Sequence, residues 1–192
     1  MMRPLTVILT FAAAFALPAL ADPIDGATAR DQLFKPTPSA AQTVPQAFLS
    51  EAEMAIVAQV AATQAYYGAM AVAPGDGLMS NATVAAANYH DLEQARVAAL
   101  TSCNARREKA EACVIVAEIV PKGHEPRAFQ LSSAATEAFN KDYKRGRGPK
   151  AMAISASTGQ WAVVKAEDAA AQAVADCAAA AHATDCVVAV QD

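Results

Sequence analysis

Ala112-Cys113-Val114-Ile115-Val116-Ala117 and Asp185-Cys186-Val187-Val188-Ala189-Val190 decide the organisation of this chain. In each stretch a cysteine opens a run rich in β-branched residues, which is typical of a buried strand. In each case a second cysteine, Cys103 or Cys177, stands upstream at the end of an alanine-rich helical pattern. The two stretches therefore predict two similar units, each with a helix, a cysteine pair and a closing strand.

The segments upstream of these two strands also follow one order. A short apolar strand is expected over 68–73 and again over 150–155, and a glycine-containing turn follows at 74–77 and at 157–159. A second strand is expected over 78–89 and 160–164, and then a helix over 91–103 and 167–180. The pattern predicts an internal duplication, with repeat 1 at 66–121 and repeat 2 at 150–192. The apolar positions of the two helices have the same spacing, at Leu92, Ala95, Ala99 and Cys103 and at Ala166, Ala169, Ala173 and Cys177.

The predicted fold class is α+β. Because alanine side chains are small, each helix can approach a sheet closely, and we expect two ββαβ-like repeats that share a sheet with the helices packed on it. An N-terminal helix precedes the repeats, since Ser50 and Glu53 form a capping box and an apolar stripe follows. This helix is expected to pack on the core rather than to bind a partner. These parts form one domain at 49–192, with a connecting segment at 122–149.

The N-terminus has the features of a secretory signal peptide at 1–21. A basic start at Arg3, an apolar run of about 13 residues and the small-residue site Ala19-Leu20-Ala21 match that pattern. A membrane-spanning helix would need roughly 20 apolar residues, so the run is too short for one. We therefore expect export to the periplasm or the extracellular space, with a mature chain that begins at Asp22. Residues 22–48 contain several prolines and are expected to form a flexible leader without a core of its own.

The chain contains four cysteines, and an even number in an exported protein favours disulfides. Four cysteines allow three pairings, and the sequence alone does not select one. The repeat favours Cys103–Cys113 and Cys177–Cys186. A zinc site is the alternative, but the usual cysteine spacing of two to four residues is absent. The formal net charge of −4 argues against general nucleic-acid binding.

The connecting segment holds an expected helix over 132–143 and then a cluster of basic residues. One interpretation is a contact site for an anionic surface or partner. The other is a solvated linker that its glycines make flexible. The candidate contact residues are Lys141, Lys144, Arg145, Arg147 and Lys150.

The residues that usually carry chemistry form no recognisable motif here. His90, His124 and His182 stand at no metal-binding spacing, and each is expected to be a surface or loop histidine, with a local contact between His90 and Asp91. The chain has no nucleophile elbow, phosphate loop or dinucleotide fingerprint. It also lacks the C-x-x-C pair of a redox protein. We therefore predict no catalytic, cofactor-binding or metal-ligating residue.

The second unit resembles a family of small exported bacterial domains. The strand at 151–155, the turn Thr158-Gly159-Gln160-Trp161, the alanine-rich helix ending in Cys177 and the strand opened by Cys186 are similar to the domain of unknown function DUF4189. The resemblance covers 151–190 best and 68–120 more loosely, where the turn is longer and lacks the tryptophan. That family has no established activity, so the resemblance implies no site residues.

Short exported chains of this type are also sometimes labelled 5-aminolevulinate synthase. That activity depends on pyridoxal phosphate, a Schiff-base lysine and a large two-domain scaffold. This chain is about half the needed size, and none of its lysines stands in a recognisable cofactor motif. We therefore do not expect that activity.

Two functional hypotheses follow from the sequence. The first is a periplasmic or secreted non-enzymatic module that binds a protein or an envelope component, without a cofactor, nucleic acid or transmembrane segment after signal cleavage. It predicts an exposed apolar or basic patch. The second is an enzyme with an unfamiliar site. It predicts a concave pocket at which His90, His124 or acidic residues converge.

Overall fold

The computed structural model describes residues 22–192, so the expected signal peptide lies outside the described residues. The helices are α1 (Gly26–Gln32), α2 (Glu51–Ala62), α3 (Leu92–Asn104), α4 (Ser133–Ala138), which continues as the π-helical turn η1 (Phe139–Tyr143), and α5 (Ala169–Ala181). The strands are β1 (Ser39–Thr43), β2 (Gly68–Val72), β3 (Val84–Ala86), β4 (Val114–Pro121), β5 (Ala151–Ser155), β6 (Trp161–Val164) and β7 (Cys186–Gln191). The expected α+β class is confirmed.

The strands form two antiparallel sheets, so the prediction of a sheet shared by both units is wrong. The first sheet has the order β1-β4-β2-β3 and the second has the order β6-β5-β7. The outer edge of β4 pairs with β1 from Ser39↔Pro121 to Thr43↔Ala117, and the outer edge of β7 is bridged by Ile24. Segments from the N-terminal region therefore occupy one edge of each unit, and no strand of one unit pairs with a strand of the other.

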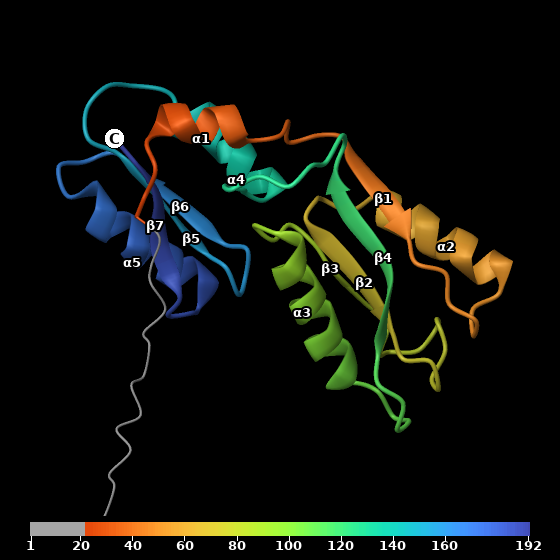
Figure 1. Cartoon of the computed structure of the whole chain (residues 1–192). Coiled ribbons are helices and arrows are strands. Elements are labelled where there is room, and N and C mark those ends of the chain that lie inside the picture. The colour runs from red at the N-terminus through yellow and green to blue at the C-terminus, as the bar shows by residue number, and fades with distance from the viewer. Residues whose placement is uncertain (1–21) are drawn as a thin grey trace, which may run out of the picture.

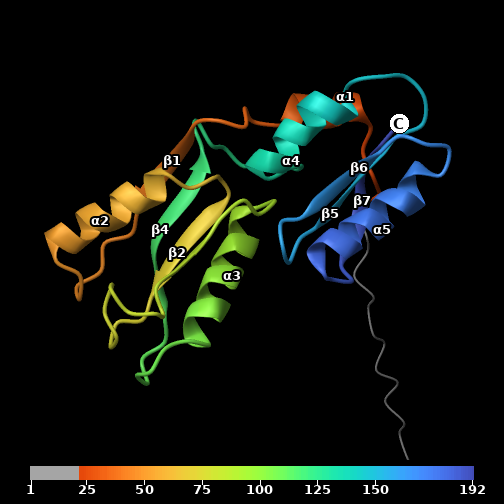
Figure 2. The same ribbon diagram turned by 180° about the vertical axis from the view of Figure 1, so that it is seen from behind.

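Helices cover both faces of each sheet (Figures 1 and 2). Residues alternate between the two faces of a strand. In β2, Ala69 and Ala71 therefore pack with α3, while Met70 and Val72 pack with α2. In β5, the alanines face α5, while Met152 packs in a cluster with residues of α1, α4 and η1. The predicted packing of alanine-rich helix faces on strands is confirmed in both units.

The two ββαβ units also share details of strand pairing. In each unit the first strand lies between the other two, as β3-β2-β4 and β6-β5-β7. The pairing register shifts between Met70 and Ala71 in the first unit and between Met152 and Ala153 in the second. These are the same positions in the two strands that the sequence pattern matches. The likeness therefore extends to an irregularity of the ladder, which the sequence pattern did not predict.

The flexible leader predicted at 22–48 is not observed, and that prediction is wrong. This segment contains α1, capped by the Asp25 side chain, and the edge strand β1. Ala29 of α1 is fully buried in the core beside Met152. The packed structure therefore begins well before residue 49. The segment places its own residues beside β4 and β7, which matters for the site described below.

Two further expectations differ in detail from the structure. The second strand of the first unit, expected over 78–89, is restricted to the short β3, because turns occupy most of 74–83. The capping box at Ser50 and Glu53 is present, and α2 packs on β1 and β4. Its outward side stays apolar, with Ile56 45% and Val60 39% exposed.

Candidate functional site

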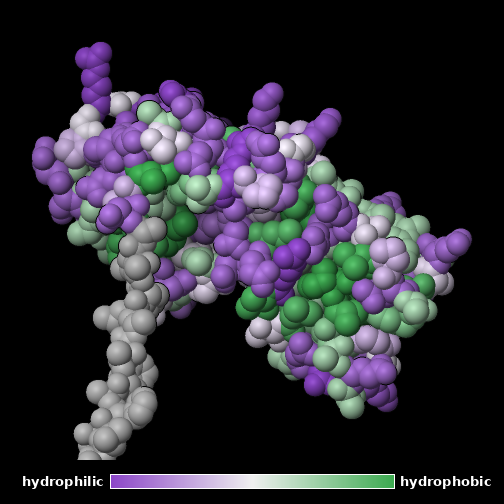
Figure 3. Space-filling view, in the orientation of Figure 1, coloured by the Kyte–Doolittle hydropathy of each residue, from purple (hydrophilic) through white to green (hydrophobic). Residues whose placement is uncertain are grey.

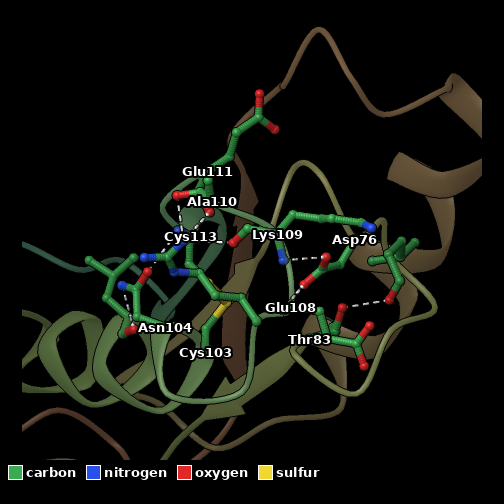
Figure 4. The surroundings of a disulfide bond; sticks show 12 residues. Asp76, Thr83, Cys103, Asn104, Glu108, Lys109, Ala110, Glu111 and Cys113 are labelled. Atoms are coloured by element: carbon green, nitrogen blue, oxygen red, sulfur yellow. Dashed lines mark hydrogen bonds between the residues drawn. A yellow bond between two sulfur atoms is a disulfide. The ribbon is translucent and has the colours of Figure 1, made fainter.

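The first disulfide joins the residues that the repeat predicts. Cys103 in the last turn of α3 is bonded to Cys113 directly before β4. Figure 4 shows the hydrogen bonds around it. The Cys113 N–H donates to the Asn104 side-chain oxygen (3.0 Å). In the loop between the two cysteines, the N–H groups of Glu108 and Lys109 donate to the Asp76 carboxylate. The disulfide and these bonds hold the charged loop between helix and strand.

The second disulfide, Cys177–Cys186, joins α5 to the start of β7. Next to it, the Asp185 carboxylate accepts hydrogen bonds from the Ser155 hydroxyl (2.7 Å) and the Ser157 N–H (2.8 Å). Each disulfide closes a short loop, which contributes about 2.5–3 kcal/mol to stability in the chain-entropy model. Both predicted pairs are confirmed, and no cysteine is left to bind zinc. The pairs fit an oxidising compartment.

The structure divides the basic cluster of the connecting segment. Lys141 pairs with Glu137, and Lys150 pairs with Asp192 at 3.2 Å with a side chain only 14% exposed. Lys144, Arg145 and Arg147 are exposed, in the loop at the upper left of Figure 1, where the surface in Figure 3 is polar. Two of the five cations are therefore engaged within the fold. A contact role for this loop stays a prediction.

His90 was expected to be a surface or loop histidine; it lies in the loop before α3 but is buried between the two units rather than on the surface. Its side chain bridges backbone groups: Nδ1 accepts from the Ser132 N–H (3.2 Å), and Nε2 donates to the Gln160 carbonyl (3.1 Å). Ser132 caps α4, and Gln160 precedes β6 of the second unit. This pattern requires the neutral tautomer with its proton on Nε2, so both ring nitrogens are already used. His90 is a structural link between the units.

The backbone next to His90 is equally close to the second unit. Asn88 has a left-handed conformation with φ of 67°, and its side-chain oxygen accepts from the Ala134 N–H (2.9 Å). Gly159, with φ of 73°, lies so close that an added Cβ would be 2.5 Å from the Asn88 carbonyl oxygen. Only glycine fits this contact. We call the contacts of Asn88, His90, Ser132, Gly159 and Gln160 the junction.

We expect the protein to lose stability as the pH falls below about 6.5, the ordinary pKa of histidine. Burial lowers the pKa of His90 in the folded state, opposed by the hydrogen bond to Gln160 and by the charges of Asp91 and Asp185. The unfolded chain therefore takes up the proton first. The free energy of unfolding should fall by about 1.4 kcal/mol per pH unit between the two pKa values.

Denaturant unfolding measured between about pH 7.5 and pH 5 tests this linkage. His90→Gln is the control, because an amide offers a donor and an acceptor but does not titrate in this range. The slope that His90 contributes should be absent from the variant. If the free energy of unfolding of His90→Gln falls with pH as steeply as that of the unmodified chain, groups other than His90 cause the pH dependence.

A basic hollow lies where the N-terminal segment meets the end of β4. Its volume is about 530 Å³. Of the described residues that line it, three are basic and none is acidic, although the whole chain carries a net charge of −4. The lining residues of this basic hollow are Leu33, Phe34, Lys35, Thr37, Pro38, Lys122 and Arg127.

Local structure explains how the cations of the basic hollow come together. Lys35 follows α1, and Lys122 follows β4, whose last residue pairs with the first residue of β1. The Lys122 N–H also donates to the Pro38 carbonyl (3.1 Å). Arg127 donates to the Gln32 carbonyl (2.8 Å), and its guanidinium lies 3.7 Å from the centre of the Phe34 ring. Its remaining N–H groups can bind an anion, although exposed Glu125 offsets part of its charge.

A second, polar hollow of about 390 Å³ shares Arg127 with the first. The His124 ring lies between Phe34 and Tyr67, with centroid separations of 5.8 and 5.6 Å. His124 lies in a loop, as expected, but its ring is half-buried and packs against two aromatic rings. The lining residues of this polar hollow are Asp91, Leu92, Glu93, His124, Pro126, Arg127 and Gln130.

Among residues 22–192, five buried side-chain polar atoms have no hydrogen-bond partner, and two of them belong to rings that pack on each other at the polar hollow. These two are Nδ1 of His124 and the hydroxyl of Tyr67, a residue only 1% exposed. Burial raises the pKa of the Tyr67 hydroxyl, which keeps it protonated. Unsatisfied buried polar groups are uncommon in folded proteins and often mark functional positions. In the part of the chain that the structure describes, no hydrogen bond joins the His124 side chain to an acid, so no catalytic pair is formed.

The remaining predicted residues give no site. His182 is exposed at the end of α5, as expected. Across residues 22–192, no group of three histidine, cysteine or acidic side chains could hold a metal. Of the lining residues, His124 was named in the enzyme hypothesis, whereas Phe34, Lys35 and Arg127 were missed because they match no motif. The only sequence signal was the grouping of charges around His124, in a proline-flanked turn.

Comparison with known proteins assigns the chain to no family. No family model matches the chain, and no curated protein or solved structure matches it. The resemblance to DUF4189 therefore stays a prediction. Of the helices within 22–192, none is long and apolar enough to cross a membrane.

Proposed function

We propose that this chain is a periplasmic or secreted, non-enzymatic module that binds an anionic component of the cell envelope through the basic hollow. The signal-peptide pattern at 1–21 and the two disulfides support the proposed export. The observation that carries the binding function is the concave site of three cations without a lining acid, in a protein of net negative charge.

The arrangement of the basic hollow suits a carboxylate or phosphate group. Arg127 is held in place by the Gln32 carbonyl and by packing on Phe34, so its free N–H groups are pre-positioned. The exposed side chains of Lys35 and Lys122 add charge that can adapt to the ligand. An anionic ligand in the hollow therefore meets a fixed guanidinium and two mobile ammonium groups.

Lys35→Gln combined with Lys122→Gln should weaken binding to an immobilised carboxylated or phosphorylated polymer about tenfold or more, because charged hydrogen bonds are lost. Binding of the unmodified protein should also fall steeply with salt. Surface plasmon resonance with the mature, disulfide-bonded chain measures both effects. Unchanged binding of the double variant would contradict a role for the basic hollow.

Arg145→Gln combined with Arg147→Gln is the matched control. It removes the same charge from the exposed loop of the connecting segment and leaves the basic hollow intact. This variant should bind almost as well as the unmodified chain. If it loses binding while the hollow variant keeps it, the contact lies in the loop. If both variants bind an acidic protein more tightly than the carboxylated or the phosphorylated polymer, the partner is a protein.

An enzyme with an uncharacterised site is the second candidate. It is favoured by the convergence of Asp91, Glu93 and His124 on the polar hollow. Asp91 already caps α3, accepting from the Gln94 N–H (2.7 Å), and Glu93 pairs with Arg96. Both acids therefore have structural partners. Conversion of a bound polymer into shorter products in the binding assay would favour this candidate.

We also propose that the two units arose by duplication. The matched strand orders, ladder irregularities and disulfides support this origin. The basic hollow lies outside the matched elements, in the N-terminal segment and the connecting segment, whereas the polar hollow is also lined by the start of α3. The binding function would then belong to what was added around the duplicated units.

A further inference from the structure

The polar hollow differs in chemistry from the basic hollow that it adjoins. Asp91 and Glu93 supply acceptors, Arg127 supplies donors, and Gln130 can supply both. The rings of His124 and Pro126 add apolar surface. A second anionic group would be repelled by the two acids, while an apolar group would leave the polar side chains without partners. The lining therefore suits an uncharged ligand that donates and accepts several hydrogen bonds.

Sugar hydroxyl groups meet this requirement, because each hydroxyl is one donor and two acceptors. The carbon face of a sugar ring can also pack on apolar rings such as His124 and Pro126. Nδ1 of His124 is buried and has no hydrogen-bond partner among the described residues. A turn of the imidazole about its Cβ–Cγ bond would bring Nδ1 to the other side of the ring, where a hydroxyl could reach it.

Arg127 connects the two hollows, because it lines both of them. The Phe34 ring of the basic hollow and the His124 ring of the polar hollow are 5.8 Å apart, between centroids. A ligand that carries a carboxylate close to a hydroxyl-bearing ring can therefore contact both hollows at once. Acidic sugars have these two groups on one residue.

We infer that the anionic ligand is an acidic glycan, with its carboxylate in the basic hollow and a sugar ring in the polar hollow. This inference rests on the proposed function, since the basic hollow supplies the charge recognition. It goes beyond that function because it assigns the ligand class and a second subsite. Gln130 and His124 are the residues expected to recognise the ring.

Isothermal titration of the mature, disulfide-bonded chain tests this inference with three probes: a short oligomer of galacturonic acid, a neutral oligosaccharide of equal length, and polyglutamate. The acidic glycan should bind at least tenfold more tightly than the other two. Gln130→Ala and His124→Phe should each weaken acidic-glycan binding about tenfold and leave polyglutamate binding unchanged. The phenylalanine keeps a ring between Phe34 and Tyr67. Gln59→Ala, an exposed glutamine on α2, is the matched control and should change nothing.

The other outcomes separate this inference from the proposed function. If polyglutamate binds as tightly as the acidic glycan and Gln130→Ala affects neither, the glycan assignment is overturned and anion binding stands. If the neutral glycan binds as well as the acidic one and Gln130→Ala weakens both, the polar hollow is supported as a glycan subsite while the anionic function fails. If no probe binds, both are overturned.

Discussion

Gly159→Ala is expected to lower the free energy of unfolding by about 3–5 kcal/mol. The left-handed backbone of residue 159 is unfavourable for alanine and costs about 1–2 kcal/mol. The new Cβ would also lie 2.5 Å from the Asn88 carbonyl oxygen and 3.1 Å from the Tyr89 Cα. Both neighbours are backbone atoms, so relief requires the two units to move apart. Denaturant unfolding with circular dichroism measures the loss.

Gly77→Ala separates the two contributions to this effect. Residue 77 has a similar φ of 80°, and an added Cβ there would have no atom within 4 Å. The control should therefore show only the cost of the backbone conformation. Equal losses in the two variants would mean that the Cβ at residue 159 is accommodated without a steric cost, which would contradict the prediction.

Local features of the fold could be predicted because they depend on residues close in sequence. The capping box at Ser50 and the alanine faces of the helices follow from spacing, and the repeat of the pattern favours the cysteine pairs. The edge strand β1 could not, because an edge strand pairs on one side only and its sequence, Ser39–Thr43, has no marked apolar alternation. The prolines upstream of it are equally typical of a flexible leader.

The candidate site could not be predicted from the sequence for a different reason. Lys35 and Lys122 become neighbours only through the pairing of β1 with β4, and β1 itself was not predicted. His90 stands beside Asp91, so its sequence context indicates a polar surface. Its two partners, Ser132 and Gln160, are 42 and 70 residues away. Long-range pairing, rather than a local pattern, creates both the junction and the hollows.

His90→Ala should lower the free energy of unfolding by about 3–5 kcal/mol. The His90 side chain is almost fully buried, and its removal leaves the Ser132 N–H without an acceptor, while the Gln160 carbonyl keeps only its bond from the Ser155 N–H (2.9 Å). Each buried group left unsatisfied costs about 1–3 kcal/mol, and the empty space adds to this. Denaturant unfolding above about pH 7 measures the loss free of histidine titration.

His90→Gln distinguishes the hydrogen bonds from simple filling of space. Its amide can accept from one backbone group and donate to the other, so it should recover part of the stability that alanine loses. His90→Leu fills a similar volume without polar atoms and should behave like alanine or worse. If leucine is as stable as histidine, the units are held by apolar packing and Gly159 alone. If glutamine is clearly better than leucine, the hydrogen bonds to Ser132 and Gln160 stabilise the contact between the units beyond apolar packing.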